Sequence, residues 1–504
     1  MKYDPTKMEE LKALIQSEAG EERLEAITLE EFVLGTGKIF ETPAVLDRIS
    51  RGKAKTLFLV SDETPIKRKG VILRDLISEI FQEKGMEVEE LVLRGDNTGL
   101  LHADMNGVMA VKSRIRPYVG VIAIGGGTIA DICKYAVFLS EKEGRGSGRT
   151  PLIVLQTATS GSAFGSNQSV IFKEGVKRTL RSVYPTAVLA DMDVIKDGPS
   201  RLNLSGFGDM MGILISSADW FVSHQIGMAQ GYSPLLVEIM EEAGKILLGI
   251  GIEVGRTSSE GLLMLDKILI MMGIVSSMGF GTTPISGFEH MISHALDLEG
   301  MATGRKLSLH GAQVGLGTAY ASVAYHLFLR EFDPDRIDWN RCYPSDEESF
   351  EEVERRFASV DDDGRSVQEI WTHYHDKLER WRSRRKDFEK FLANWQQPNG
   401  ARDTILKKLA SPEDVIRGLS LSGNPAIPEE LIPALSKDQM KFAFLNARFM
   451  RDRFVIGDIL GFTGAIDDRF WDRVDQEVRR LRIQARSEGG DGRSTLQEKR
   501  RLRE

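Results

Sequence analysis

A short apolar segment that ends in three glycines constrains the fold of this chain more than any other feature. Residues 118–124 (YVGVIAI) have the composition of a buried parallel strand, and three glycines, 125–127, follow directly. Segments with strand character and segments with helical spacing alternate before it, with strands at 55–61 and 88–94 and helices at 73–84 and 105–115. This alternation predicts an α/β domain built on a doubly wound parallel sheet.

The composition of the chain changes near residue 199, where long segments with helical spacing replace the short strands. We therefore expect an α/β domain over 1–197 and an all-helical domain over 198–476. The remaining residues, 477–504, are strongly charged and have little to bury. They are expected to form a disordered tail.

A stretch at 367–395 has apolar residues in steps of three and four, interrupted only by Arg385. This spacing predicts one long helix. The helix either lies with its apolar face on the helical domain or forms an oligomer contact, and both interpretations are open. The sequence as a whole contains no internal repeat.

The overall composition excludes several classes of protein. A formal net charge of -8 over 504 residues gives no basic footprint for nucleic acid. Two cysteines cannot form a disulfide framework, which fits a reducing compartment, and the N-terminus has no apolar signal segment. The most apolar stretch, 262–280, contains Asp266 and Lys267 and is interpreted as a buried helix. We expect a cytoplasmic protein without a membrane span.

The glycines at 125–127 join the predicted strand to a helix that begins near Thr128. Because glycine has no Cβ atom, a pyrophosphate could approach this backbone, and the helix N-terminus would offer free N–H groups and a partial positive charge. The pattern is not the usual GxGxxG, so a simple tight turn is equally open. Asp131 and Lys134 fall in the first turns of the same helix.

A loop at 156–169 (QTATSGSAFGSNQS) is dense in small hydroxyl residues and lies between predicted strands at 152–155 and 170–172. Such side chains could line a cofactor cleft and form hydrogen bonds with a ribose or nicotinamide. From composition alone, a plain Ser/Thr-rich loop is an equal alternative.

Three short strings combine an aspartate with histidines: GFGD ending at Asp209, SGFEHMISH ending at His294, and LHG around His310. His290 and His294 are spaced i,i+4 and therefore share a helix face. The chain has only eight histidines, and three of them, His290, His294 and His310, fall within the 21 residues 290–310. One aspartate and two histidines form a set that binds a divalent metal while leaving coordination positions open for a substrate.

These motifs occur together in an order that resembles a known superfamily. GGGTIADICK, TATSGSAFGSNQS, SGFGDMMGILISSADW, SGFEHMISHALD and LHGAQVGLGT are similar, in order and spacing, to glycerol dehydrogenase, iron-containing alcohol dehydrogenase and dehydroquinate synthase. Within this superfamily the chain most resembles the bacterial branch of the sn-glycerol-1-phosphate dehydrogenases. The later segment 447–454 (ARFMRDRF) resembles the same branch, and the likeness covers about residues 25–470.

The resemblance implies a Rossmann-like nucleotide-binding domain followed by an all-α metal-binding domain. It also implies roles for individual residues, which fall into three groups: metal ligands Asp209, His290 and His310; catalytic residues His294, Asp131 and Lys134; and cofactor-binding residues Asp62, Gly125, Gly126, Gly127, Thr128, Thr157, Ser160 and Ser166. The sequence departs from related polyol dehydrogenases at Ser162, where they have an aspartate.

The implied activity is reduction of dihydroxyacetone phosphate to sn-glycerol 1-phosphate with NAD(H) or NADP(H) and one divalent metal, Zn, Ni or Fe. The substrate would be a small phosphorylated molecule and the protein a homo-oligomer, such as a dimer. Alternatives are a glycerol or other polyol dehydrogenase, a lyase like dehydroquinate synthase, and a metal-free binding protein. The lyase branch has a glutamate as its first metal ligand, where this chain has Asp209.

Overall fold

The computed structural model describes residues 1–96, 101–144, 148–173, 176–361 and 364–488, which form two compact units. The first unit comprises Met1–Phe207 and Arg256–Gly281. The second comprises Gly208–Gly255 and the chain from Thr282 onward. The division differs from the predicted single boundary at residue 197, because the segment 256–281 returns to the first unit.

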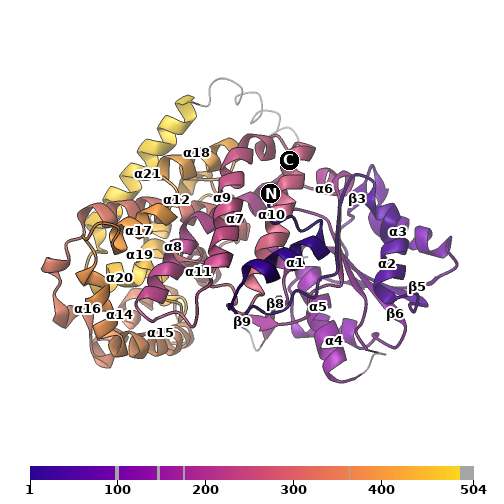
Figure 1. The fold of residues 1–504 in the computed structure, drawn as a ribbon, viewed down its shortest axis with the longest axis horizontal. Helices are drawn as coiled ribbons and strands as arrows, with labels where there is room; N and C mark the ends of the chain where they lie inside the picture. The colour runs from indigo at the N-terminus through magenta and orange to yellow at the C-terminus, as the bar shows by residue number, and fades with distance from the viewer. Residues whose placement is uncertain (97–100, 145–147, 174–175, 362–363, 489–504) are drawn as a thin grey trace. The chain divides into compact units, whose positions relative to one another are not determined.

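The first unit is built on a parallel sheet of six strands, which confirms the predicted fold class. Figure 1 shows these strands with helices on both sides. Their spatial order is β1 (Glu31–Gly35), β10 (Ala187–Asp191), β7 (Leu152–Gln156), β6 (Val119–Gly125), β2 (Thr56–Asp62) and β5 (Glu87–Leu93). The residues before 55, in which no element was predicted, thus contain an edge strand, β1, which pairs with β10 near the end of the α/β segment.

Helices cover the two faces of this sheet because alternate strand residues point to opposite sides. Leu57, Leu59 and Ile122 face α2 (Thr42–Ser50) and α3 (Leu73–Gln82) in one hydrophobic core. On the other face, α5 (Gly127–Lys142) contacts β6, β2 and β7, and α4 (Met105–Lys112) packs against α5. Strands buried on both faces are apolar throughout, which is why β6 could be recognised in the sequence.

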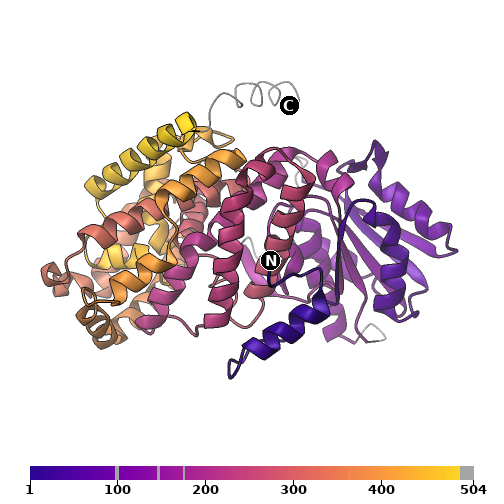
Figure 2. The same ribbon diagram turned by 45° about the horizontal axis from the view of Figure 1, so that its top comes forward.

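Four more helices and two hairpins complete this unit or border it. The predicted strand at 170–172 belongs to a separate antiparallel hairpin, so it does not extend the parallel sheet. Figure 2 shows α1, in dark indigo, apart from the strands of the sheet, whereas Asp266 of α10 accepts a hydrogen bond from Gln156 at the end of β7. The elements are α1 (Met8–Glu18), α6 (Met192–Asp197), α10 (Ser259–Ser276), the first part of α7 (Ser200–Met211), β3 (Lys67–Arg68) with β4 (Val71–Ile72), and β8 (Gln168–Lys173) with β9 (Val176–Arg181).

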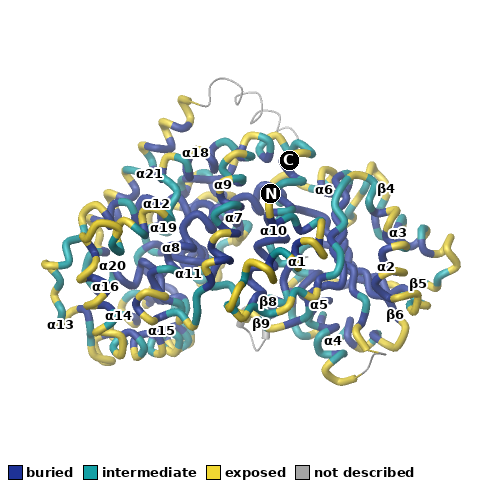
Figure 3. Tube along the Cα trace, viewed as in Figure 1, coloured by how far each residue is buried: buried dark blue, intermediate teal, exposed yellow. Residues whose placement is uncertain are grey.

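The second unit is helical in all its described parts, apart from the loops that join the helices. Its central helix, α12 (His310–Glu331), is buried on nearly all sides, as expected for a helix without a polar face. Figure 3 shows the buried residues gathered around such central elements. The other helices are α8 (Ile213–Gln225), α9 (Pro234–Gly255), α11 (Phe288–Ala302), α13 (Trp339–Cys342), α14 (Asp346–Phe357), α15 (Arg365–Ser383), α16 (Arg385–Ala393), α17 (Ala401–Lys408), α18 (Pro412–Ser422), α19 (Lys437–Asn446), α20 (Ile456–Phe462) and α21 (Asp468–Glu488).

Two predictions for this unit were wrong. The single helix expected over 367–395 is divided into α15 and α16 at Arg384, and Trp395 lies beyond the second helix. The first twelve residues of the expected tail, 477–488, belong instead to α21, which continues to Glu488 and buries Val478 and Leu481. Residues 489–504 lie outside the described part of the chain.

Among the described residues, none of the helices is long and apolar enough to cross a membrane. The stretch expected to be a buried helix, 262–280, corresponds mainly to α10, which is buried within the first unit.

Candidate active site

Asp209, His290 and His310 come together in the second unit. Asp209 lies near the end of α7, His290 in the first turns of α11, and His310 is the first residue of α12. One ligand atom from each lies within 4.8 Å of the other two. The Nε2 atoms of His290 and His310 are 3.4 Å and 3.9 Å from the same Asp209 oxygen, Oδ1.

These separations fit a divalent metal. Ligand atoms held about 2.1 Å from a tetrahedral ion are about 3.4 Å apart, and an imidazole–carboxylate set suits Zn and similar metals. The side chains of Asp209 and His290 are about one tenth exposed, whereas that of His310 is 43% exposed. One of the three candidate ligands is therefore accessible to solvent, while the other two are largely enclosed.

Glu289 orients the first histidine. Its side chain is fully buried, and its Oε1 lies 2.9 Å from Nδ1 of His290, so Nε2 is left to face Asp209. Burial alone would lower the pKa of His290, but hydrogen bonds to Asp209 and Glu289 raise it to about 9. Two carboxylates thus make this position strongly attractive to positive charge.

Ser293 plays the corresponding part for the second histidine. Its hydroxyl lies 3.2 Å from Nδ1 of His310 and donates to Oε1 of Gln313 at 2.9 Å. Both histidines are therefore held through Nδ1, with Nε2 toward Asp209. His294 is one turn beyond His290, and its ring centre is 6.1 Å from that of His310, on the partly open side of the cluster.

Two glycines allow the ligand-bearing helices to approach each other. Gly208 precedes Asp209, and a Cβ atom there would lie 2.4 Å from the carbonyl oxygen of Gly311, which follows His310. Any side chain at 208 would separate α7 from α12 and move the two ligands apart. The strings GFGD and LHG thus contain the backbone contact as well as the ligands.

The candidate nucleotide site lies in the first unit, where the strand order reverses. From β2 the chain goes to β5 at one edge, then returns past β2 to β6 and continues toward the other edge. Ligands of doubly wound sheets bind beyond the carboxyl ends of the strands at such a switch point. Asp62 ends β2, and Gly125 ends β6 immediately before α5.

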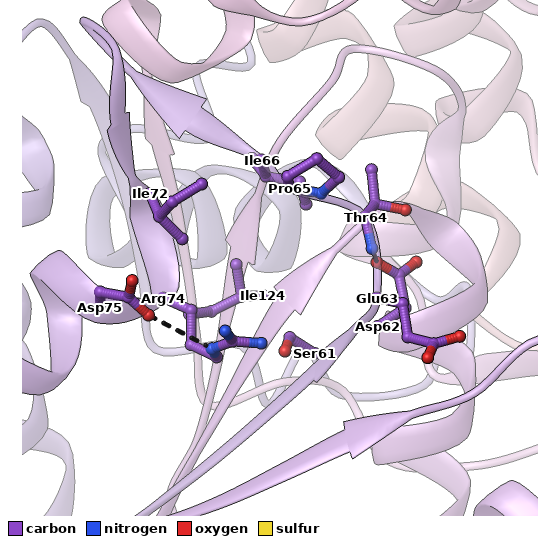
Figure 4. A pocket seen from close by; sticks show the side chains of 10 residues that line it. All are labelled: Ser61, Asp62, Glu63, Thr64, Pro65, Ile66, Ile72, Arg74, Asp75 and Ile124. Carbon is purple, nitrogen blue, oxygen red and sulfur yellow. Dashed lines mark hydrogen bonds and ion pairs between the residues drawn. The ribbon is translucent and has the colours of Figure 1, made fainter.

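A pocket opens at this place, lined by residues that follow β2 and by Ile124 of β6. Figure 4 shows its side chains, with Asp62 and Glu63 opposite Asp75. Gly126 precedes the first turn of α5, and a Cβ atom there would meet no atom within 4 Å, so the approach to this helix N-terminus is open. The N–H groups of the first turn, which includes Gly127 and Thr128, have no partner within the helix.

The Ser/Thr-rich loop lies beside the same helix, since Ala163 is 3.8 Å from a Cβ atom built at Gly127. Thr157 is buried, whereas Ser160 and Ser162 are partly exposed. Ser166 is buried and lies 3.2 Å from the carbonyl oxygen of Gln168, so it helps to fold the loop. Of the three loop residues predicted to bind cofactor, Thr157, Ser160 and Ser166, Ser160 alone is partly exposed.

Asp131 and Lys134 form a buried ion pair of 3.0 Å. The Lys134 side chain has no exposed surface, and its ammonium donates to the carbonyl oxygens of Ala163 and Gln168 at 2.7 and 2.5 Å. Asp131 accepts a hydrogen bond from the backbone of Val170 at 3.0 Å. Because an ammonium without exposed surface cannot touch a substrate, this geometry favours a positioning role over the predicted catalytic one: the pair holds the loop onto α5.

Sequence reasoning missed the buried acids that surround the metal ligands. Glu289 stands next to His290 in the quoted string, and Asp219 belongs to the SADW string, but neither received a role. Asp219 accepts hydrogen bonds from the backbone of Phe288 at 2.7 Å and from Tyr325 at 2.5 Å. Adjacency to a predicted ligand was the signal available for Glu289, whereas the partners of Asp219 are distant in sequence.

Comparisons with known proteins agree with this architecture. A model of the family described as iron-containing alcohol dehydrogenase matches residues 33–199. The NAD(P)+ glycerol-1-phosphate dehydrogenase of Bacillus subtilis (strain 168) is 32% identical over 63% of this chain and 78% of that protein. The enzyme of the same name from Pyrococcus horikoshii is 30% identical over 57% of this chain and 76% of its own length. In fold, the chain is similar to the glycerol dehydrogenase of Schizosaccharomyces pombe, with a TM-score of 0.54 at 16% identity and 92% of each chain covered.

Proposed function

The chain belongs to the iron-containing alcohol dehydrogenase family, and we propose that it catalyses the reversible, NAD(P)H-linked reduction of dihydroxyacetone phosphate to sn-glycerol 1-phosphate. The observation that carries the proposal is the Asp209–His290–His310 cluster with its open side at His310. A metal-free binding protein has no use for three converging ligands that are held in place by Glu289 and Ser293.

Each group of residues has a separate task in this reaction. Asp209, His290 and His310 would hold the metal, and residues 125–128 would receive the nucleotide pyrophosphate. When bound, the metal polarises the ketone oxygen and the nicotinamide supplies the hydride to carbon. Reduction also needs one proton at that oxygen. His294 supplies it from a ring nitrogen and, being partly exposed, regains it from solvent.

The proposal of a phosphorylated substrate is supported by the curated relatives and by Ser162. Both relatives above are named glycerol-1-phosphate dehydrogenases. Ser162 opens a short 3-10 helix, Ser162–Gly165, and is partly exposed. A hydroxyl can donate a hydrogen bond to a phosphate, whereas an aspartate at the same place would repel it.

The test is the steady-state oxidation of NADH with dihydroxyacetone phosphate and with free dihydroxyacetone, each supplied with Zn, Ni or Fe. We expect a much higher kcat/KM for the phosphate ester. Equal or better turnover of the free ketose would contradict the phosphate proposal and favour a simple polyol dehydrogenase. Absence of oxidation of both NADH and NADPH with every ketose would contradict the reductase activity itself.

A further inference from the structure

The start of helix α11 sets the position of His290, and two side chains from other parts of the second unit hold it. Asp219 of α8 accepts the N–H of Phe288, the first residue of α11, at 2.7 Å. Arg453 donates to the carbonyl oxygen of Ser286 at 2.5 Å and to the hydroxyl of Thr282 at 2.7 Å. The segment before α11 is therefore fixed by a guanidinium, and its first turn by a carboxylate.

Both of these contacts lead to one segment, residues 447–458. Arg453 belongs to it, and the N–H of Ile456 donates to the second oxygen of Asp219 at 2.6 Å. The segment also packs tightly on α11, because a Cβ atom at Gly457 would lie 2.5 Å from the ring of Phe288. Any displacement of this segment would therefore be passed to the helix that carries Glu289 and His290.

The segment is in turn held by α15, through Lys377. The ammonium of Lys377 forms a 2.9 Å ion pair with Asp458 and donates to the carbonyl oxygens of Arg448 and Arg453, the latter at 3.2 Å. The ammonium therefore contacts the same segment at three positions, through one ion pair and two hydrogen bonds. This arrangement fixes the segment more closely than one contact could.

Neighbouring side chains add to the same contact. Arg448 donates to Tyr374 of α15 at 3.0 Å and to Glu352 of α14 at 2.9 Å. Trp381 of α15 stacks on Phe462 of α20, with ring centres 4.8 Å apart and an angle of 6° between the ring planes. Helices α14 and α15 thus both contact the segment at Arg448, and α15 also packs on α20, which overlaps its end.

We propose that Lys377 and Arg453 are positioning residues for the metal site, through which α14 and α15 fix the start of the helix that carries His290. The inference rests on the proposed metal site. Helices α14 and α15 are then a functional part of this protein, because they determine how rigidly Glu289 and His290 face Asp209. Lys377 touches neither metal nor substrate and acts only through the segment 447–458.

The test compares Co²⁺ binding by the full-length wild type and by the double variant Lys377→Met/Asp458→Asn. Removing both charges avoids leaving one of them buried alone, and the asparagine side chain can still accept the N–H of Val455, as Asp458 does. We expect Co²⁺ affinity, measured by chelator competition, to fall by about 10–100-fold, as for other residues that orient metal ligands. The visible absorption spectrum of bound Co²⁺ should change as well, since it reports ligand geometry.

A matched control is Arg482→Met/Glu430→Gln, which removes another ion pair of low exposure, 2.9 Å long, in the same unit. Glu430 also accepts a backbone N–H, that of Ala426. The control should keep the wild-type Co²⁺ affinity and spectrum even if its melting temperature falls. If the Lys377 variant does not fold, Arg453→Lys tests the other end of the same connection, because lysine retains the charge but cannot reproduce the two-nitrogen contact.

The outcomes separate the two proposals. Wild-type affinity and an unchanged spectrum in the folded Lys377 or Arg453 variants would overturn the inference, while the metal site would stand. An equal loss in the control would also overturn it, since the effect would then be general destabilisation. A wild-type protein that takes up no Co²⁺ would contradict the metal site, and the positioning roles with it.

Discussion

At the scale of single residues, Asp62 bears on the choice of nucleotide. It ends β2 at the switch point of the sheet and accepts the N–H of Thr64 at 2.9 Å, which fixes its carboxylate at the pocket. A carboxylate there can accept hydrogen bonds from a ribose 2′-OH and repels a 2′-phosphate. We predict a preference for NADH, and expect Asp62→Ser to raise the NADPH/NADH ratio of kcat/KM.

The neighbouring variant Glu63→Ser is the control for this prediction, because it removes an equal charge from the same loop. It should change the ratio much less. A clear NADPH preference of the wild type, or equal effects of the two variants, would show that Asp62 does not contact the ribose.

A second residue-scale feature is the buried pair of Gln156 and Asp266 in the first unit. The amide of Gln156 donates to Oδ1 of Asp266 at 2.7 Å and to the carbonyl oxygen of Ala158 at 3.0 Å. Among the described residues, the other oxygens of the pair, Oε1 and Oδ2, have no hydrogen-bond partner. A proton on Asp266 would let Oδ2 donate to Oε1 and complete a two-bond acid–amide pair beside Thr157.

The pH dependence of stability tests this protonation. Burial raises the pKa of Asp266 from 3.8 to about 7, although the hydrogen bond from Gln156 lowers it. The folded state holds this proton more tightly than the unfolded chain does. The contribution of Asp266 to the free energy of unfolding is therefore fully present below about pH 4, and decreases by up to about 4 kcal/mol as pH rises toward 7. Asp266→Asn cannot ionise and can form the same pair. It should therefore gain stability over the wild type as pH rises from 4 to 7, measured by urea unfolding.

The control for this titration is Asp4→Asn, at a carboxylate that pairs with Lys267 of the same helix as Asp266, at 2.7 Å. Burial raises the pKa of Asp4, but its hydrogen bonds to Lys267 and Thr6 outweigh that effect and lower it. The contribution of Asp4 to the free energy of unfolding is therefore lost on acidification. Relative to the wild type, Asp4→Asn should lose stability as pH rises from 4 to 7, whereas Asp266→Asn should gain it. Parallel stability curves for the wild type and Asp266→Asn would contradict a neutral Asp266.

Candidate site residues were predictable where they belong to a short sequence motif. The strings around Asp209, His290 and His310 contain the ligands, and the structure brings these three together. Asp219 and Asp266 could not be assigned, because their roles depend on burial and on partners that are distant in sequence. Lys134 was assigned a catalytic role from its motif alone, since sequence does not reveal that its ammonium is enclosed by backbone carbonyls.

At the scale of elements, the contact between α7 and the Ser/Thr-rich loop depends on one glycine. A Cβ atom at Gly206 would lie 2.0 Å from the carbonyl oxygen of Thr159, and neither backbone can yield easily. Gly206→Ala should therefore destabilise the protein by about 1–3 kcal/mol through overpacking, and should weaken NADH binding because the loop must move. Urea unfolding and NADH titration measure the two effects.

The matched control is Gly249→Ala in α9, where an added Cβ atom meets nothing within 4 Å. Alanine in an exposed helix interior should stabilise by about 0.5–1 kcal/mol, because it restricts the unfolded chain. A Gly206→Ala variant as stable as the wild type would mean that α7 does not pack on the loop as described.

The strands that belong to the alternating pattern of strands and helices were predictable, whether buried or not. The predicted bounds of β2, β5 and β6 differ from the observed ones by one residue, although β5 is an edge strand in which only Leu93 is buried. The edge strand β1 has only five residues, begins with Glu31 and was not predicted. The break after α15 was not predicted either, because the steps of three and four continue across it and only Arg385 occupies an apolar position of the series. Arg385, just beyond the break, lies over the rings of Trp339 and Tyr343, with its guanidinium carbon 5.6 and 5.2 Å from their centres.

At the scale of the whole molecule, the order of a strand-rich segment and a helix-rich segment predicts the fold class. It does not predict that α10 belongs to the first unit. This helix has the same apolar spacing as its neighbours, and only tertiary contacts assign it: Asp266 with Gln156, Lys267 with Asp4, and the carbonyl oxygen of Ser276 with the Gln168 side chain at 2.6 Å. A helix pattern specifies an apolar face but not the partner that covers it.

The most direct test of the account is NADH oxidation with dihydroxyacetone phosphate before and after removal of metal, for the wild type and for His310→Ala. His310 is the most exposed ligand, so its loss should leave the fold largely intact. We predict that a chelator abolishes wild-type activity, that added Zn, Ni or Fe restores it, and that His310→Ala is inactive with little bound metal. Full activity of the metal-stripped wild type, or of His310→Ala, would contradict the central claim that this chain is a metal-dependent dehydrogenase.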